Sequence, residues 1–123
     1  MSRYFFAIGA LLAGIGVAAG AFGAHGLEDQ VSADRLATFQ TGVAYHIYHA
    51  LGLLAVAWAA GQGWGAAAHW AGYCFVAGIA LFSGSLYVLV LTDTPWLGAV
   101  TPFGGVAFIV GWALLAWGAL QGG

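Results

Sequence analysis

Residues 4–24 read YFFAIGALLAGIGVAAGAFGA, a continuous apolar run without a charged side chain, and this run decides the fold. A helix needs about 20 such residues to cross a hydrocarbon core about 30 Å thick. Residues 42–60, 70–91 and 102–120 have similar length and also lack charge. Because lipid offers no hydrogen-bond partner to a free backbone group, each run must be helical. The sequence therefore predicts one all-α domain, an integral membrane bundle of four transmembrane helices.

The composition supports a membrane protein and excludes several other classes. Hydrophobic residues make up 63% of the chain and charged residues only 5%, whereas about 25% of an average soluble domain is charged. The chain has only two basic residues, Arg3 and Arg35, and four acidic ones. This composition excludes a cationic surface for nucleic acid. The single cysteine, Cys74, excludes an internal disulfide. We therefore expect the lipid bilayer as partner, together with a homo-oligomer or other membrane proteins, and no cofactor.

The connections are short, which predicts an up-down-up-down order of helices. Ser32 suits the N-cap position, so the second helix should begin near residue 33. Residues 61–69, GQGWGAAAH, resemble a glycine-punctuated turn. The pair Thr94-Pro95 predicts a short interfacial turn, and the pair Thr101-Pro102 predicts the start of the last helix. With one arginine on each side of the membrane, the positive-inside rule gives little guidance, and we expect both termini in the cytoplasm.

Small residues recur at helical spacing in several runs. Helices in lipid associate by close van der Waals fit, which favours small residues at their contacts. The first run has glycine every seven positions, and the last run repeats the pattern; the predicted packing glycines are Gly9, Gly16, Gly20, Gly23, Gly104, Gly111 and Gly118. In the third run we expect Ala77, Ala80 and Gly84 to form the equivalent contact. A seven-residue period predicts left-handed crossings of about 20°.

Polar side chains gather in one half of the predicted bundle. With alternating topology, the ends of helices one and three share a membrane side with the starts of helices two and four. The residues placed there are His25, Thr41, Tyr45, His46, His49, Ser83, Ser85, Tyr87 and Thr101. An ionisable group within a span usually faces the bundle interior and pairs with another group. If Tyr87 faces inward, its phenol should reach His49 or His25.

Three interpretations of this cluster remain open. The polar groups can satisfy one another as links between helices, each hydrogen bond contributing roughly 0.6–2 kcal/mol. They can instead line a pathway for a ligand, an ion or a proton. In the third interpretation His25, His46 and His49 bind a metal or haem, although no intramembrane carboxylate or thiolate accompanies them. An enzyme is not favoured, because no acid within the spans can orient a histidine beside a serine.

Several strings resemble a known family when they are taken together. These are GAFGAH at 20–25, QTG at 40–42 with the following Tyr45 and His49, FSGSLY at 82–87, and TPFGG at 101–105 with GW at 111–112. They are similar to the signature of the YgdD-like family, small bacterial membrane proteins of unknown function with organellar relatives. The resemblance covers essentially the whole chain. It implies a four-helix protein of the bacterial inner membrane, and it supplies no activity, substrate or cofactor.

Together these observations predict a non-enzymatic packing, assembly or partner-binding bundle with a polar pocket on the side of the first and third loops. One alternative is a conduit or carrier for a small solute or a proton. A second alternative is a haem- or metal-binding membrane protein.

Overall fold

The computed structural model describes residues 2–122, and within them all regular structure is helical. The first two long helices are α1 (Ser2–His25) and α2 (Ala33–Gly61). The third span is continuous and consists of α3 (Gly65–Gly78), a π-helical turn η1 (Ile79–Ser83) and α4 (Gly84–Thr92). A short 3-10 helix, η2 (Pro95–Ala99), leads into α5 (Thr101–Gly122). Four helical stretches are long and apolar enough to cross a membrane, which confirms the predicted fold class.

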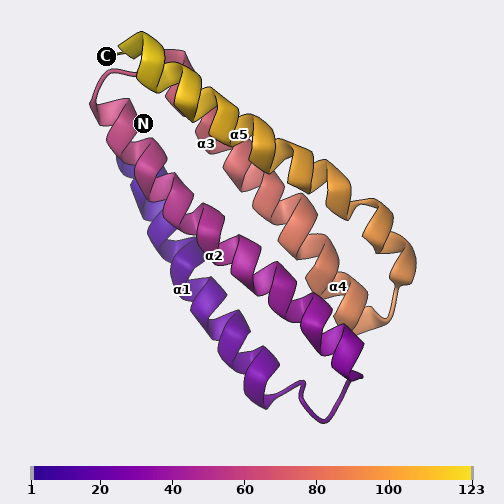
Figure 1. Ribbon diagram of the computed structural model, residues 1–123. Coiled ribbons are helices and arrows are strands. Elements are labelled where there is room, and N and C mark those ends of the chain that lie inside the picture. The colour runs from indigo at the N-terminus through magenta and orange to yellow at the C-terminus, as the bar shows by residue number, and fades with distance from the viewer. Residues whose placement is uncertain (1, 123) are drawn as a thin grey trace.

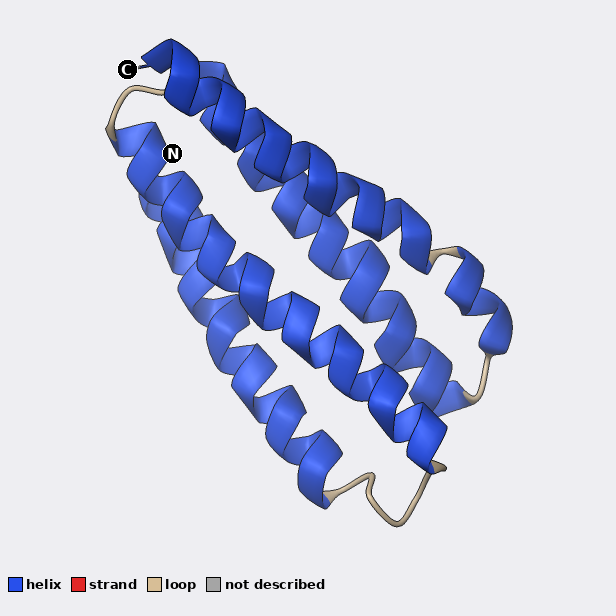
Figure 2. Ribbon diagram, in the orientation of Figure 1, coloured by secondary structure: helices blue, strands red, loops and turns tan. Residues whose placement is uncertain are grey.

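The helices run up and down in alternation (Figure 1). The connection between α1 and α2 lies at the same end as the segment between α4 and α5, and both termini lie at the opposite end. Only short loops join the helices (Figure 2). The first and third connections therefore lie at one end of the bundle, as the alternating order predicts.

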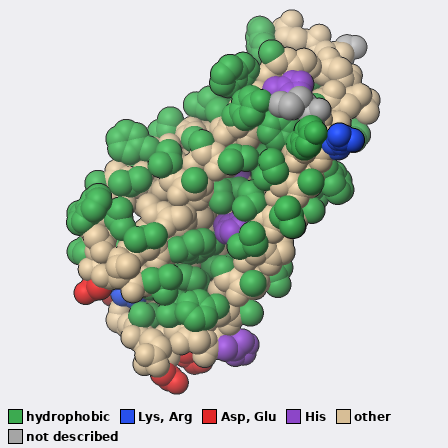
Figure 3. Space-filling view, turned by 180° about the vertical axis from the view of Figure 1, so that it is seen from behind, with side chains coloured by type: hydrophobic (Ala, Val, Ile, Leu, Met, Phe, Trp, Pro, Cys, Tyr) green, Lys and Arg blue, Asp and Glu red, His purple; other side chains and the backbone are tan. Residues whose placement is uncertain are grey.

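Helix α2 is the central element of the bundle. In the most apolar 18-residue stretch of each span, 50% of α2 is buried, compared with 17% of α1 and 28% of the last span. It packs most extensively against α1 and also contacts α3, α4 and α5. Hydrophobic side chains cover the length of the surface, and acidic groups lie at one end (Figure 3). The outer faces of α1 and α5 are consequently the main surfaces offered to the membrane.

Helix starts follow local chemistry at the second and third spans. Ser32 caps α2, because its hydroxyl accepts a hydrogen bond from the backbone N–H of Arg35 at 3.2 Å. The third helix begins at Gly65, so the expected turn over residues 61–69 is wrong in its second half. Gly63 and Gly65 adopt φ of 84° and 68°, which reverses the chain within three residues. The alanines that follow continue the helix because nothing interrupts it.

Aromatic rings pack against glycine in this bundle. The ring of Phe75 packs against both Gly52 and Gly111. A Cβ built on Gly52 would lie only 3.0 Å from this ring. Phe39 packs on Gly23 in the same way, at 3.0 Å from a Cβ built there. Gly9 instead makes room for the Ala50 carbonyl and the Leu53 side chain. The missing side chain thus makes room for a bulky neighbour at most of these contacts.

The predicted contact seam of the third span is wrong. Ala77 and Ala80 are exposed on the outside of the bundle. The buried face instead carries Phe75, the largest fully buried side chain, and the glycines Gly72 and Gly78. These glycines receive Phe5 and Phe108 from the neighbouring helices. Small size alone therefore does not identify a contact face, because a ring that fills a glycine notch buries more apolar area than an alanine does.

Candidate functional site: a buried polar network

His46 links three helices near the middle of the bundle. Its Nε2 lies 2.8 Å from the carbonyl oxygen of Leu12 on α1, and its Nδ1 lies 2.8 Å from the phenol oxygen of Tyr87 on α4. A carbonyl can only accept, so Nε2 must carry the proton. A neutral ring then accepts the Tyr87 O–H at Nδ1. The side chain is buried, and both of its nitrogens are occupied by protein partners.

The partner of Tyr87 differs from the prediction. We expected its phenol to reach His49 or His25, and it contacts His46 instead. The reason is geometric, because His46 and His49 lie about 60° apart around the helix axis. His46 faces the side of α2 on which α1 and α4 lie, whereas His49 faces α3 and α5.

His49 connects α2 with α5. Its Nδ1–H donates to the Tyr45 carbonyl of its own helix at 2.8 Å. The indole N–H of Trp112 donates to its Nε2 at 3.0 Å. Since an indole N–H is only a donor, Nε2 of His49 must be unprotonated. The ring also stacks on Phe108 with a centroid distance of 3.5 Å and an angle of 7° between planes, so its orientation is fixed on both sides.

His49 must be neutral because the indole donates to its Nε2, and His46 should be neutral because burying an imidazolium without a carboxylate partner is costly; the two rings are then in opposite tautomers. In ¹⁵N spectra of the purified protein at neutral pH, His46 should show the Nε2–H form and His49 the Nδ1–H form, because their partners impose these protons. Replacing each histidine in turn by glutamine assigns its signals. Identical tautomers, or an imidazolium at either position, would contradict this assignment.

Two serines of the third span form further links, one to α2 and one to α5. Ser83, in the π turn, is fully buried and donates to the Gly42 carbonyl at 2.6 Å. Ser85 shares a hydrogen bond of 2.6 Å with Thr101 at the start of α5. The π turn widens the helix here, since the Gly84 N–H bonds the Ile79 carbonyl five residues back. Among residues 2–122, no buried side-chain nitrogen or oxygen lacks a hydrogen-bond partner.

Other predicted site residues are not brought into this network. His25 is exposed at the end of α1. Thr41 is exposed and bonds only the Ala37 carbonyl of its own helix at 3.0 Å. The Tyr45 ring is 40% exposed and stacks on Phe82 with centroids 4.6 Å apart. The predicted cluster is thus a set of separate interhelical links.

The histidines considered for a metal do not gather either. His46 and His49 use all four ring nitrogens in contacts on different sides of α2, and His25 lies at the end of α1. Over the described part of the chain, no three His, Cys, Asp or Glu side chains lie close enough to share an ion. The residues present do not fit a haem or metal site built from these three side chains.

Sequence reasoning missed two aromatic members of the network. Trp112 is the donor to His49, and Phe108 is its stacking partner. A usable signal existed for Trp112, which stands in the middle of the last run, far from the headgroup region where tryptophan usually lies. An indole N–H at that depth requires an acceptor inside the protein. Phe108 carries no comparable signal.

A polar pocket of about 430 Å³ does open at the end that holds the first and third connections. Its lining differs from the predicted cluster and consists of Gln30, Val31, Ser32, Arg35, Val90, Leu91 and Asp93. Arg35 and Asp93 form an ion pair of 3.1 Å across it. Because the Asp93 side chain is 84% exposed, water screens this pair strongly.

Comparisons with known proteins agree with a membrane protein. The family described as "Protein of unknown function (DUF423)" matches residues 19–105. A "UPF0382 membrane protein YwdK" of Bacillus subtilis is 48% identical over 121 residues, covering 97% of this chain and 98% of the relative. The "UPF0382 membrane protein SSP2132" of Staphylococcus saprophyticus is 45% identical over 119 residues, with 97% and 98% covered. No solved structure matches significantly.

Proposed function

The chain belongs to the DUF423 family of proteins of unknown function, and from that premise we propose that it is a non-enzymatic packing or assembly bundle. It spans the lipid bilayer, and its buried polar groups hold its own helices together. In this proposal the outer faces of α1 and α5 contact lipid, a second copy or another membrane protein.

One observation carries this proposal: the buried polar side chains of residues 2–122 are all hydrogen-bonded within the chain. A conduit for protons or solutes needs polar groups free to exchange with water or cargo. Here the groups with that chemistry, His46, His49 and Ser83, each bond a partner on a neighbouring helix. They therefore favour the structural role over the pathway and over the haem or metal alternative.

The outer faces of α1 and α5 offer apolar surface to lipid or to a protein partner. Large apolar side chains are exposed along α1 and α5, among them Leu11, Ile15, Val17, Phe103 and Ile109. A bilayer alone accommodates such faces, and so does a homo-oligomer or a partner helix. Chemical crosslinking in native membranes, followed by mass measurement of the products, separates these cases.

Location and orientation form the finer part of the proposal. We place the chain in the bacterial inner membrane and within the YgdD-like group. Arg3 stands at the end of the bundle that holds both termini, and Arg35 at the other end is paired with Asp93. We also place both termini in the cytoplasm; because each end carries one arginine, labelling of the termini, and not the positive-inside rule, tests this orientation.

Thiol labelling tests whether the network is closed to water. In a Cys74→Ala background, Ser83→Cys introduces a single thiol of similar size at a fully buried position. We expect a charged methanethiosulfonate reagent to leave this thiol unmodified in native membranes and to modify it completely once SDS unfolds the protein. The matched control, Asp29→Cys in the exposed first connection, should react readily in membranes. Rapid labelling of Ser83→Cys in the folded protein would instead support a wet pathway.

A further inference from the structure

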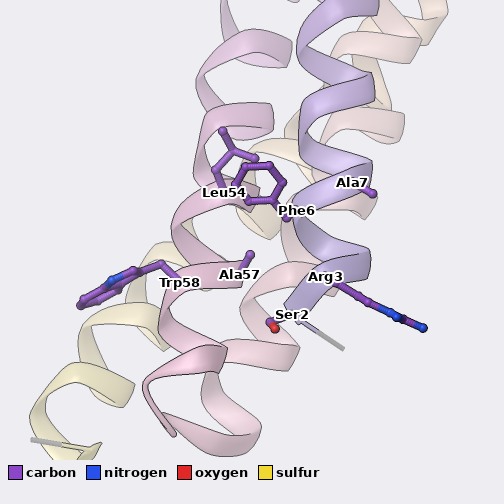
Figure 4. A pocket seen from close by; sticks show the side chains of 7 residues that line it. All are labelled: Ser2, Arg3, Phe6, Ala7, Leu54, Ala57 and Trp58. Atoms are coloured by element: carbon purple, nitrogen blue, oxygen red, sulfur yellow. The ribbon is translucent and has the colours of Figure 1, made fainter.

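A groove of about 460 Å³ lies between the start of α1 and the last turns of α2. Figure 4 shows Phe6, Leu54 and Ala57 between the two helices, whereas Arg3 and Trp58 extend in opposite directions from the groove. The floor is therefore apolar, and the edges carry a cation and an amphipathic ring. The groove lies closer to the termini than the His46 and His49 network does, because Leu54, Ala57 and Trp58 follow His49 along α2.

The charge at this end of the bundle is unbalanced. The four acidic residues of the chain are Glu28, Asp29, Asp34 and Asp93, and all belong to the segments at the opposite end. Arg3 contacts its neighbour Tyr4. One guanidinium nitrogen lies 3.3 Å from the phenol oxygen, and the guanidinium carbon Cζ lies 5.1 Å from the ring centroid. These contacts leave its positive charge without a carboxylate among residues 2–122. Its natural complement is an anion.

We propose that this groove binds one anionic phospholipid of the surrounding bilayer. In this proposal an acyl chain lies along Phe6, Leu54 and Ala57, and the exposed Arg3 side chain, which extends away from the groove in the unliganded chain, turns to pair with the headgroup phosphate at the groove edge. The depth is appropriate, because Arg3 and Trp58 stand near span ends, where headgroups and tryptophan anchors lie. A second copy of the chain is a poorer occupant, since a protein interface here would bury the unpaired guanidinium. The proposal does not depend on the role of the polar network.

Native mass spectrometry of the delipidated protein in a neutral detergent tests this site. Palmitoyl-oleoyl phosphatidylglycerol and palmitoyl-oleoyl phosphatidylcholine are titrated separately, and the affinity of the first bound lipid is compared. One favourable contact between a cation and an anionic lipid predicts about fivefold tighter binding of phosphatidylglycerol. Both lipids carry the same chains, so the ratio reports the headgroup alone.

Variants separate the headgroup contact from the chain contact. Arg3→Gln should abolish the preference for phosphatidylglycerol, and Arg3→Lys should retain it. Arg35→Gln removes the same charge at the other end and should leave the preference unchanged. Ala7→Trp fills the groove from an exposed position and should weaken the binding of both lipids. Ala18→Trp, exposed on the same face of α1 three turns away, should weaken the binding of neither lipid.

Three results would overturn the site. The first is equal binding of the two lipids by the unaltered protein. The second is a preference that survives Arg3→Gln or falls equally in Arg35→Gln. The third is unchanged binding in Ala7→Trp. Because Arg3, Ala7 and Ala18 are exposed, these variants should keep the helical circular dichroism of the parent protein, and that spectrum is the folding control.

Discussion

Gly104→Ala should destabilise the bundle by about 1–3 kcal/mol, the usual cost of forcing an extra carbon into a packed core. A Cβ built on Gly104 would overlap the backbone nitrogen of Phe82 and lie 2.7 Å from its Cβ and 2.8 Å from its Cα. Backbone atoms cannot rotate away, so α5 would have to shift relative to the π turn. That shift would also strain the hydrogen bond between Ser85 and Thr101. Reversible unfolding by SDS in mixed micelles, followed by circular dichroism, measures the change.

Gly105→Ala is the matched control for this variant. A Cβ at Gly105 would meet only the Phe82 ring, at 3.9 Å, which is ordinary contact. Both substitutions add the same methyl group to adjacent positions of one helix, so the gain in helix propensity cancels between them. We expect Gly105→Ala to leave stability unchanged or to raise it by up to about 1 kcal/mol, the usual gain in helix propensity. Equal losses at both positions would show that the close contact at Gly104 is not what limits the packing.

The membrane-spanning fold could be read from the sequence because it follows from composition and length. Four uncharged runs leave the backbone no stable state in lipid except the helix. Short connections then force neighbouring spans to alternate in direction. Ser32 was also readable, because a hydroxyl before a helical run satisfies a free N–H at its start.

Packing partners could not be read in the same way. The seven-residue spacing marks Gly23 and Gly111 as contact positions, but it does not reveal that Phe39 and Phe75 fill the space beside them. Which aromatic ring packs on which glycine depends on how two helices are shifted along their axes relative to each other. The residue spacing within a single helix does not contain that information. The expected Ala77 and Ala80 seam was wrong for this reason.

The polar network shows a second limit of sequence reasoning. His46 and His49 lie on neighbouring sides of one helix, and the sequence indicates only that both should face the bundle interior. Their partners depend on which helix packs against each side. The π turn at Ser83 has no readable signature either, because its extra residue is accommodated only in the assembled bundle. The pairing of these polar groups was therefore not predictable from the sequence.

His46→Leu should cause the largest loss among changes to the polar network, about 1–3 kcal/mol, the usual cost of leaving a buried polar group without its partner. Leucine has a similar volume, so little of the effect comes from a cavity. The substitution removes the hydrogen bonds to the Leu12 carbonyl and the Tyr87 phenol, and with them the polar link from α2 to both α1 and α4. SDS unfolding of the purified variant measures the loss. His69→Leu is the matched control, because His69 bonds only the Gly65 carbonyl of its own helix and should change stability by no more than about 0.5 kcal/mol.

A double-mutant cycle decides whether this loss belongs to the interhelical contact. Tyr87→Phe removes only the phenol oxygen, and the double variant His46→Leu/Tyr87→Phe leaves neither partner unpaired. If the 2.8 Å hydrogen bond stabilises the bundle, the double variant should lose less stability than the sum of the two single losses. The difference should be about 0.6–1.7 kcal/mol, the range measured for such bonds in membranes. Strict additivity would mean that His46 acts through α1 alone. In that case α4 would be held by the packing of its apolar side chains, and the network would link two helices where the structure joins three.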